Sequence, residues 1–177
     1  QSALNGFMIL DADAHNTPGN ANTFTVVESY ITSPTIDLST HPDVVLQFNH
    51  YFRPFADTEM LVEVSGDDGI TWTQFDVRNG QATNQASTNS ILETIYISQI
   101  AGGSSTAKIR FHWLGGTHYF WMIDDVRICP APNNDLRLEQ VFYNTLLDST
   151  RDRHYTQIPQ NQTTGDTNRF AASFINL

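Results

Sequence analysis

Apolar and polar residues alternate along most of this chain, and this period of two constrains the fold more than any other feature. In Ile109-Arg110-Phe111-His112-Trp113 the odd positions are apolar and the even positions are polar. The same pattern runs through residues 61–65, where Val62 and Val64 share one face. Such alternation buries one face of each segment and leaves the other face in water, as in a half-buried β-strand. Helical periodicity is nearly absent.

Strand signals recur along the chain between turn-rich stretches that contain glycine, proline and asparagine. We expect strands over residues 6–11, 24–31, 44–52, 59–65, 70–77, 91–98, 107–114 and 119–128. Many short strands with this punctuation predict an all-β fold, a sandwich or jelly roll. A hydrophobic fraction of 40% supports a packed core, and we expect Trp72, Trp113 and Trp121 to fill it.

A proline- and asparagine-rich stretch after Cys129 predicts a domain boundary. We therefore expect a first domain over residues 1–129 and a linker over residues 130–135. Residues 136–143 and 170–177 have strand character, but so short a region makes a poor independent fold. Residues 136–177 are predicted to be the Ig-like start of a second β-domain or a C-terminal extension that packs on the first. The whole chain is expected to be a piece of a longer protein.

Composition excludes several classes of partner. Asp and Glu number 19 against 9 Lys and Arg, for a net charge of −10. An acidic surface repels phosphate backbones, which makes nucleic acid a poor partner, and it lacks the basic face that anionic lipid needs. No apolar run is long enough for a membrane-spanning helix, so we expect no membrane insertion. Cys129 is the single cysteine, which excludes an intrachain disulfide.

Residues 65–72, Ser-Gly-Asp-Asp-Gly-Ile-Thr-Trp, match the Asp-box pattern Ser-x-Asp-x-Gly-x-Thr-Trp. This pattern predicts a β-hairpin in which Asp67 bonds backbone amides of the turn and Gly69 supplies a positive φ. In sialidases such boxes recur blade by blade and are structural. One copy in a chain that otherwise lacks propeller features predicts a structural hairpin here too.

The order of motifs resembles that of the MAM-like jelly-roll modules of secreted Bacteroidetes proteins, including cleaved-adhesin and choice-of-anchor type domains. The motifs occupy residues 5–13, 29–39, 45–48 and 62–65, the Asp-box hairpin, residues 109–111 and finally Trp121-Met122-Ile123-Asp124-Asp125-Val126. The closing Ile-Asp-Asp-Val is the most specific of them. The paired cysteines of animal MAM domains are absent, so the adhesion functions of those domains do not carry over.

This resemblance implies a jelly-roll (concanavalin-A-like) antiparallel β-sandwich, often with bound calcium. It implies a module appended to adhesins, peptidases or polysaccharide-degrading enzymes and exported by the type IX secretion system. The expected localisation is therefore secreted, either extracellular or on the cell surface.

Two pairs of carboxylates are candidate calcium ligands. Asp11 and Asp13 end an early strand, while Asp124 and Asp125 lie on the closing strand. The first and last strands of a jelly roll commonly neighbour each other, which would bring the pairs together. Calcium takes six to eight oxygen ligands, and loop carbonyls would supply the remainder. Adjacent strand residues point to opposite faces, so a metal-free hydrogen-bonded cluster is the alternative to a structural calcium site.

Aromatic residues near strand ends provide a candidate ligand site. Tyr51 and Arg53 end one predicted strand, while His118 and Tyr119 follow the turn at Gly115-Gly116. Exposed rings with polar neighbours hold sugars and also anchor protein interfaces. These four side chains are the predicted ligand-binding residues. The alternative is that their rings pack into the sandwich.

No catalytic motif is evident. The histidines are scattered without a His-x-x-x-His pair, no Gly-x-Ser-x-Gly elbow occurs, and no carboxylate pair is associated with a readable cleft. We therefore predict no enzyme activity. We predict a calcium-stabilised, non-catalytic binding or adhesion module of a larger secreted or cell-surface bacterial protein. Its expected partners are a glycan or surface protein and the neighbouring domains of the same polypeptide. The alternative is a structural spacer or an accessory domain attached to a secreted hydrolase.

Overall fold

The computed structural model describes residues 6–16, 25–132, 136–145 and 168–176. Contacts divide the chain into two compact units, Gln1–Ala131 and Pro132–Leu177. In the second unit, β9 (Leu136–Thr145) and β10 (Asn168–Asn176) pair as an antiparallel two-stranded sheet. The described residues contain no helix long and apolar enough to cross a membrane.

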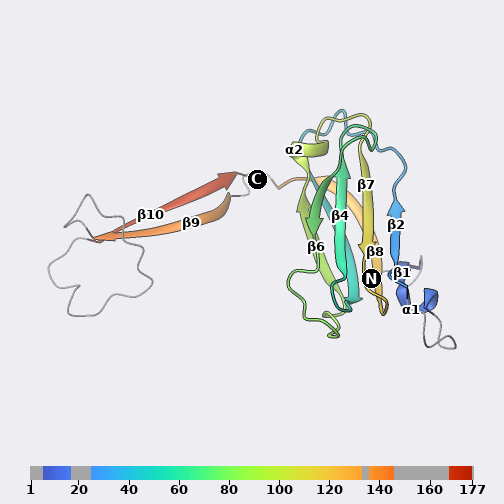
Figure 1. Ribbon diagram of the computed structural model, residues 1–177. Coiled ribbons are helices and arrows are strands. Elements are labelled where there is room, and N and C mark those ends of the chain that lie inside the picture. The colour runs from blue at the N-terminus through green and yellow to red at the C-terminus, as the bar shows by residue number, and fades with distance from the viewer. Residues whose placement is uncertain (1–5, 17–24, 133–135, 146–167, 177) are drawn as a thin grey trace, which may run out of the picture. The chain divides into compact units, whose positions relative to one another are not determined.

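The first unit is built from two four-stranded antiparallel sheets (Figure 1). The β1 sheet has the order β1 (Met8–Asp11), β8 (Phe120–Pro130), β3 (Val44–Arg53) and β6 (Ile91–Tyr96). The β2 sheet has the order β2 (Glu28–Thr32), β7 (Lys108–Leu114), β4 (Glu59–Ser65) and β5 (Thr73–Asp76). The short helices α1 (Ala12–His15) and α2 (Ser98–Ala101) lie in connections between strands.

The connectivity is that of a jelly roll. The first four strands along the chain alternate between the sheets, and after the β4–β5 hairpin the last four alternate again. This wrapping places the first and last strands side by side as β1 and β8. The predicted all-β jelly-roll sandwich is therefore confirmed, and each predicted strand of this unit has a counterpart in the structure. Strand β8 extends to Pro130, the first residue of the predicted linker, which pairs with Val44.

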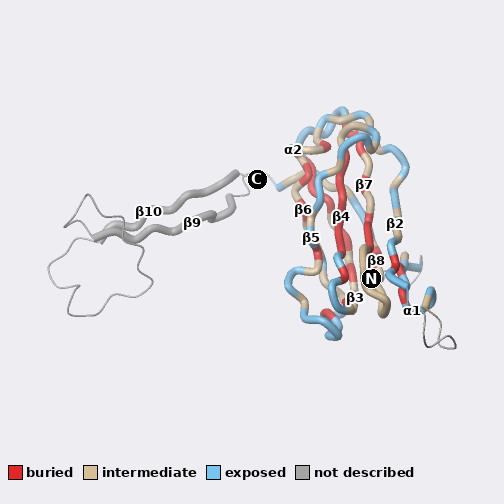
Figure 2. Tube along the Cα trace, in the orientation of Figure 1, coloured by how far each residue is buried: buried red, intermediate tan, exposed pale blue. Residues whose placement is uncertain are grey.

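Inward-facing residues of both sheets form one core. Figure 2 shows the buried segments concentrated in the central strands, β4 above all. Trp113 and Trp121 are at most 1% exposed, as predicted, and Trp121 packs edge-on against Phe111 at 5.7 Å between ring centroids. Burying each of these indoles contributes about 3 kcal/mol of hydrophobic stabilisation. Trp72, which was also predicted to lie in the core, does not.

A β-bulge interrupts β8 at the Ile-Asp-Asp-Val element. Asn49 faces Asp124 whereas Gln47 faces Arg127, so β8 has one residue more than β3 in this interval. Asp125 takes up the extra length with a φ of 51°, a left-handed conformation that aspartate tolerates better than most residues.

The bulge switches which residues of β8 face inward. Before it, the odd positions Trp121 and Ile123 are buried in the core. After it, Ile128 packs against the core, while Arg127 turns outward and donates to the Gln47 side chain. Without the extra residue, the period of two would place Arg127 on the inner face. The element that marks the resemblance therefore has a clear structural role.

Candidate functional site

The outer face of the β2 sheet carries a connected set of polar and aromatic side chains. The strand register places Tyr30 beside His112, and Glu63 between Arg110 and Gln74. These positions alternate with the inward-facing core positions. We call the following side chains the outer-face network: Glu28, Tyr30, Glu63, Trp72, Gln74, Arg110 and His112.

Glu63 is the centre of the network. It lies on the outward side of β4 yet is only 1% exposed, so this strand is buried on both faces. Its carboxylate accepts from Arg110 Nε and from Gln74 Nε2 at 2.7 Å, and it lies 3.2 Å from His112 Nδ1. A buried carboxylate is costly unless it is paired and hydrogen-bonded, and Glu63 is both.

The electrostatics of Glu63 follow from these contacts. Burial by itself raises the pKa of the Glu63 carboxyl. The hydrogen bonds from Arg110, Gln74 and His112 act in the opposite direction, and the net result is a pKa below the ordinary value. Glu63 is therefore a fixed anion at neutral pH that holds its neighbours in place.

Arg110 links the carboxylate to two aromatic rings. Its guanidinium carbon lies 4.7 Å from the ring centroid of Tyr30 and 4.2 Å from that of Trp72. Both distances are within the range of cation–π attraction. Arg110 uses Nε for Glu63, and within residues 6–16 and 25–132 its two terminal nitrogens make no hydrogen bond. They remain available as donors at the surface.

Tyr30 forms a platform on the network. Its ring lies over His112, with ring centroids 4.3 Å apart and an interplanar angle of 30°, yet the residue is 49% exposed. The phenol donates to Glu28 Oε1, which also lies 3.2 Å from His112 Nε2. The hydrogen bond to Glu28 raises the pKa of Tyr30, and the same bond lowers the pKa of Glu28. The ring is therefore held by His112, by Arg110 and at its hydroxyl, while about half of the residue remains exposed.

The Asp box positions Trp72. Ser65 Oγ accepts from Gly69 N at 2.8 Å, and Asp67 Oδ1 accepts from Thr71 N at 2.8 Å. These bonds fix the β4–β5 hairpin, as predicted. Hydrogen bonds that Thr71 and Ser65 donate to the Asp67 carboxylate lower its pKa to about 2. Trp72 Nε1 then donates to the Gly69 carbonyl at 2.9 Å. The indole is thereby fixed against Arg110 on the outer face, which corrects its predicted place in the core.

Three of the four predicted ligand-binding residues meet at one end of the sandwich. Arg53 stacks over the Tyr119 ring at 4.1 Å and donates through Nε to the Asn84 carbonyl at 2.9 Å. His118 meets the Phe55 ring edge-on at 4.7 Å. We call Arg53, Phe55, His118 and Tyr119 the tip cluster. The fourth predicted residue, Tyr51, packs instead on Phe120, with ring centroids 5.4 Å apart.

The predicted calcium ligands lie in separate places. Strand β1 does pair with β8, but Asp11 faces Phe120, whereas Asp124 lies four residues further along β8. At about 3.3 Å per residue this offset is about 13 Å. Asp13 lies 3.3 Å from His118 Nδ1 at the tip.

Each remaining carboxylate has a local hydrogen bond. Asp11 caps α1 by accepting from Ala14 N at 2.9 Å. Asp124 accepts from the Asp125 amide at 2.8 Å, and Asp125 accepts from the Asn49 side chain at 3.1 Å. The described residues contain no group of three or more His, Cys, Asp or Glu side chains arranged to hold a metal ion. The four aspartates therefore do not fit a single calcium site.

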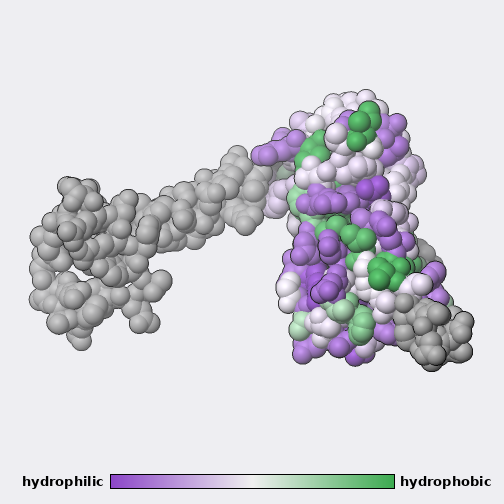
Figure 3. Space-filling model, viewed as in Figure 1, coloured by the Kyte–Doolittle hydropathy of each residue, from purple (hydrophilic) through white to green (hydrophobic). Residues whose placement is uncertain are grey.

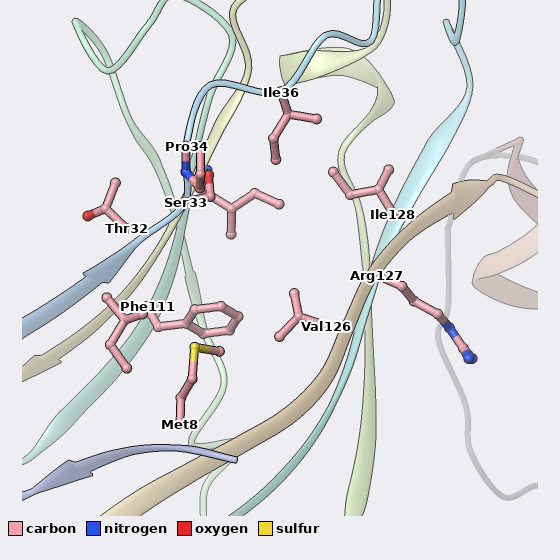
Figure 4. A pocket seen from close by; sticks show the side chains of 11 residues that line it. Met8, Thr32, Ser33, Pro34, Ile36, Phe111, Val126, Arg127 and Ile128 are labelled. Atoms are coloured by element: carbon pink, nitrogen blue, oxygen red, sulfur yellow. The ribbon is translucent and has the colours of Figure 1, made fainter. Parts of the chain in front are cut away.

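An apolar groove of about 430 Å³ opens between the edges of the two sheets. Figure 4 shows Met8, Phe111 and Val126 gathered at its centre, while Arg127 points away. Its lining is almost wholly apolar and lacks the convergent polar groups with which a binding site orients a polar ligand. By contrast, the face of the unit seen in Figure 3 is largely hydrophilic, with separate hydrophobic patches.

Comparisons with known proteins give little guidance. No protein-family model matches the chain, and no curated protein matches it. Among solved structures, the chain is similar to TmCBM61 in complex with β-1,4-galactotriose, with 12% sequence identity and a TM-score of 0.38. The match covers 73% of this chain and 86% of that one. A likeness of this size carries no functional argument, so the case for function rests on the residues of this chain.

Sequence reasoning missed the outer-face network, although one signal for it is visible. Glu63 interrupts the apolar run Leu61-Val62-Glu63-Val64, and a carboxylate within such a strand needs a partner. Its partners Arg110 and His112 stand at alternate positions of another strand. The sequence shows each side chain but not the register that joins them.

Proposed function

We propose that this chain is a non-catalytic glycan-binding module whose ligand lies on the outer-face network. The observation that carries the proposal is Tyr30, a half-exposed residue whose ring is nonetheless fixed, packed against His112 at a tilt of 30° and bonded to Glu28. Rigid aromatic rings bind at a low entropic cost because few rotamers are lost. The apolar face of a sugar ring can pack on the exposed part of such a ring.

Polar groups that can bond sugar hydroxyls flank the platform. Glu28 bonds Tyr30 through Oε1, which leaves Oε2 as an acceptor, and the terminal nitrogens of Arg110 are donors. A hydroxyl both donates and accepts, so an adjacent pair of hydroxyls can bond both groups. A few placed polar groups around an apolar contact are typical of small-molecule recognition.

The wider setting of the module is part of the proposal. The motif order supports a module of a larger secreted or cell-surface bacterial protein, beside adhesive or polysaccharide-degrading domains. Calcium stabilisation remains a prediction from the same resemblance. A melting temperature that is higher in calcium than in a chelator would support it, because an ion that binds the folded state raises stability. Equal melting temperatures would contradict it.

A glycan array tests the proposal. We expect the chain to bind a subset of glycans and Tyr30→Ala to lose that binding. The matched control is Leu92→Ala, which removes a 54% exposed side chain from β6, on the other sheet. Circular dichroism checks that both variants remain folded. Absence of binding by the unaltered chain would favour a structural spacer.

A further inference from the structure

We infer that the outer-face network takes uncharged glycans and rejects those that carry carboxylate or sulfate groups. This inference rests on the proposed function and names the class of ligand for the same face. It follows from how the charges of the β2 sheet are distributed.

The two basic residues that face outward from β7 are already matched by carboxylates. Arg110 is paired with Glu63, and Lys108 Nζ lies 2.8 Å from Asp68 Oδ1. Neither cation therefore offers an unmatched positive charge to an anionic ligand. Arg110 still has N–H donors, so it can bond a neutral hydroxyl without a net attraction for anions.

Three further carboxylates face outward, and none of them forms an ion pair with a lysine or arginine of residues 6–16 and 25–132, although Glu28 lies 3.2 Å from His112 Nε2. Glu28 and Glu59 stand on either side of Leu114 in the register, on β2 and β4. Asp76 lies on β5 and pairs with Leu61, so its side chain also faces outward. All three acids are exposed.

These acids border one side of the network. Asp76 lies in the same register row as Tyr30, through His112 and Leu61, while Glu28 and Glu59 lie in the next row, about 7 Å along the strands. Tyr30, Arg110 and Trp72 lie in contact across the sheet, from β2 toward β5. Adjacent strands are about 4.8 Å apart, so the sheet is about 14 Å wide. A short oligosaccharide that crosses the sheet from Tyr30 toward β5 therefore has these acids along one side. Like charges repel, and an anionic sugar would meet this repulsion from that side of the face.

Matched polymers test the inference. Uronate polysaccharides would be compared with their own carboxyl-reduced forms, which keep the linkage and lose the charge. We expect reduced forms to bind about tenfold more tightly than the parent uronates at low salt. The difference should shrink as salt rises toward about 0.5 M because screening weakens the repulsion.

A charge variant distinguishes repulsion of the uronate by the acids from a poor fit of its shape to the face. Glu59→Gln with Asp76→Asn removes two outward charges without altering Tyr30, Glu28 or Arg110. Asparagine at position 76 still offers a side-chain oxygen to the Arg78 amide, which now donates a hydrogen bond of 2.8 Å to Asp76 Oδ1. We expect unchanged binding of neutral polymers and a uronate penalty reduced to about threefold.

Two results would overturn the inference while leaving the proposed function in place. One is uronate binding as tight as that of the reduced form. The other is a penalty that the double variant does not change. Failure to bind any polymer, charged or neutral, would instead overturn the proposed function.

Discussion

The outer-face network and the tip cluster contain similar residue types but differ in construction. The network is placed by strands and one fixed hairpin, and it surrounds the buried Glu63. The tip cluster stands where β3 ends and β8 begins, next to the glycine turn. Its Tyr119 has a φ of 73°, a left-handed conformation that is uncommon for a residue with a side chain.

This difference shows why aromatic content alone is a poor guide to a site. Both clusters place an arginine on an aromatic ring. In the network, the arginine is also bonded to a buried carboxylate, so its geometry is determined from below. At the tip, Arg53 is fixed by one backbone carbonyl. Sites held by a supporting layer of contacts lose less freedom on binding, and this favours the network as the ligand site.

The largest effect is expected when the centre of the network is altered. Glu63→Gln keeps the shape of the side chain but leaves Arg110 without its anion, so we expect unfolding to become easier by about 3 kcal/mol. Glu59→Gln is the control, since it alters an exposed residue on the same side of the same strand and should change stability by less than about 0.5 kcal/mol. Urea unfolding measures both. Equal effects would show that the network is not a stabilising unit.

The core and the two clusters should lose stability in different pH ranges. His50 is 1% exposed and accepts from Trp121 Nε1 at 3.2 Å, and burial lowers its pKa from 6.5 to about 4. Folding therefore favours the neutral ring, and stability should fall as the pH drops from about 6.5 to about 4. The loss should reach about 3 kcal/mol at most.

The carboxylates contribute to acid unfolding in a lower pH window. Glu63 has a pKa below its ordinary value of 4.5, so its contribution is present above that pH and is lost only below it. His50→Gln has no titrating ring and should remove the loss between pH 6.5 and 5. Melting curves across this range would show it. A slope that persists in the variant would place the acid-sensitive group elsewhere.

The smallest effect is expected at the tip. Arg53→Ala removes one partly exposed cation–π contact, and we expect a loss of stability of about 0.5 to 1 kcal/mol. Urea unfolding measures it beside Glu63→Gln. A loss as large as that of the network variant would mean that the two clusters are equally well supported, and the contrast between them would fail.

Much of the sandwich could be predicted from the sequence because a period of two reports which side of a strand is buried. Trp113 and Trp121 follow this rule. The bulge at Asp124 and Asp125 has a sequence signal as well, since the apolar positions change from odd at Ile123 to even at Ile128. Those aspartates attracted a calcium interpretation because carboxylates are calcium ligands, whereas their position is explained by the change of register.

The outer-face network could not be predicted from the sequence, for a different reason. Glu63 and its partners on β7 are brought together by pairing between strands that are distant in the sequence. Alternation gives the face of a residue but not its neighbour on the next strand, and a shift of two residues would preserve the face and change every partner. Trp72 fits the Asp-box pattern, but the pattern does not say on which side of the hairpin the indole lies.

The central claim is most directly tested by one glycan array probed with the unaltered chain, Tyr30→Ala and Tyr119→Ala. Each aromatic variant removes one ring from one cluster, so the two serve as controls for each other. The account predicts that the unaltered chain and Tyr119→Ala bind the same glycans, while Tyr30→Ala binds none of them. Retained binding by Tyr30→Ala together with loss in Tyr119→Ala would contradict it and move the site to the tip.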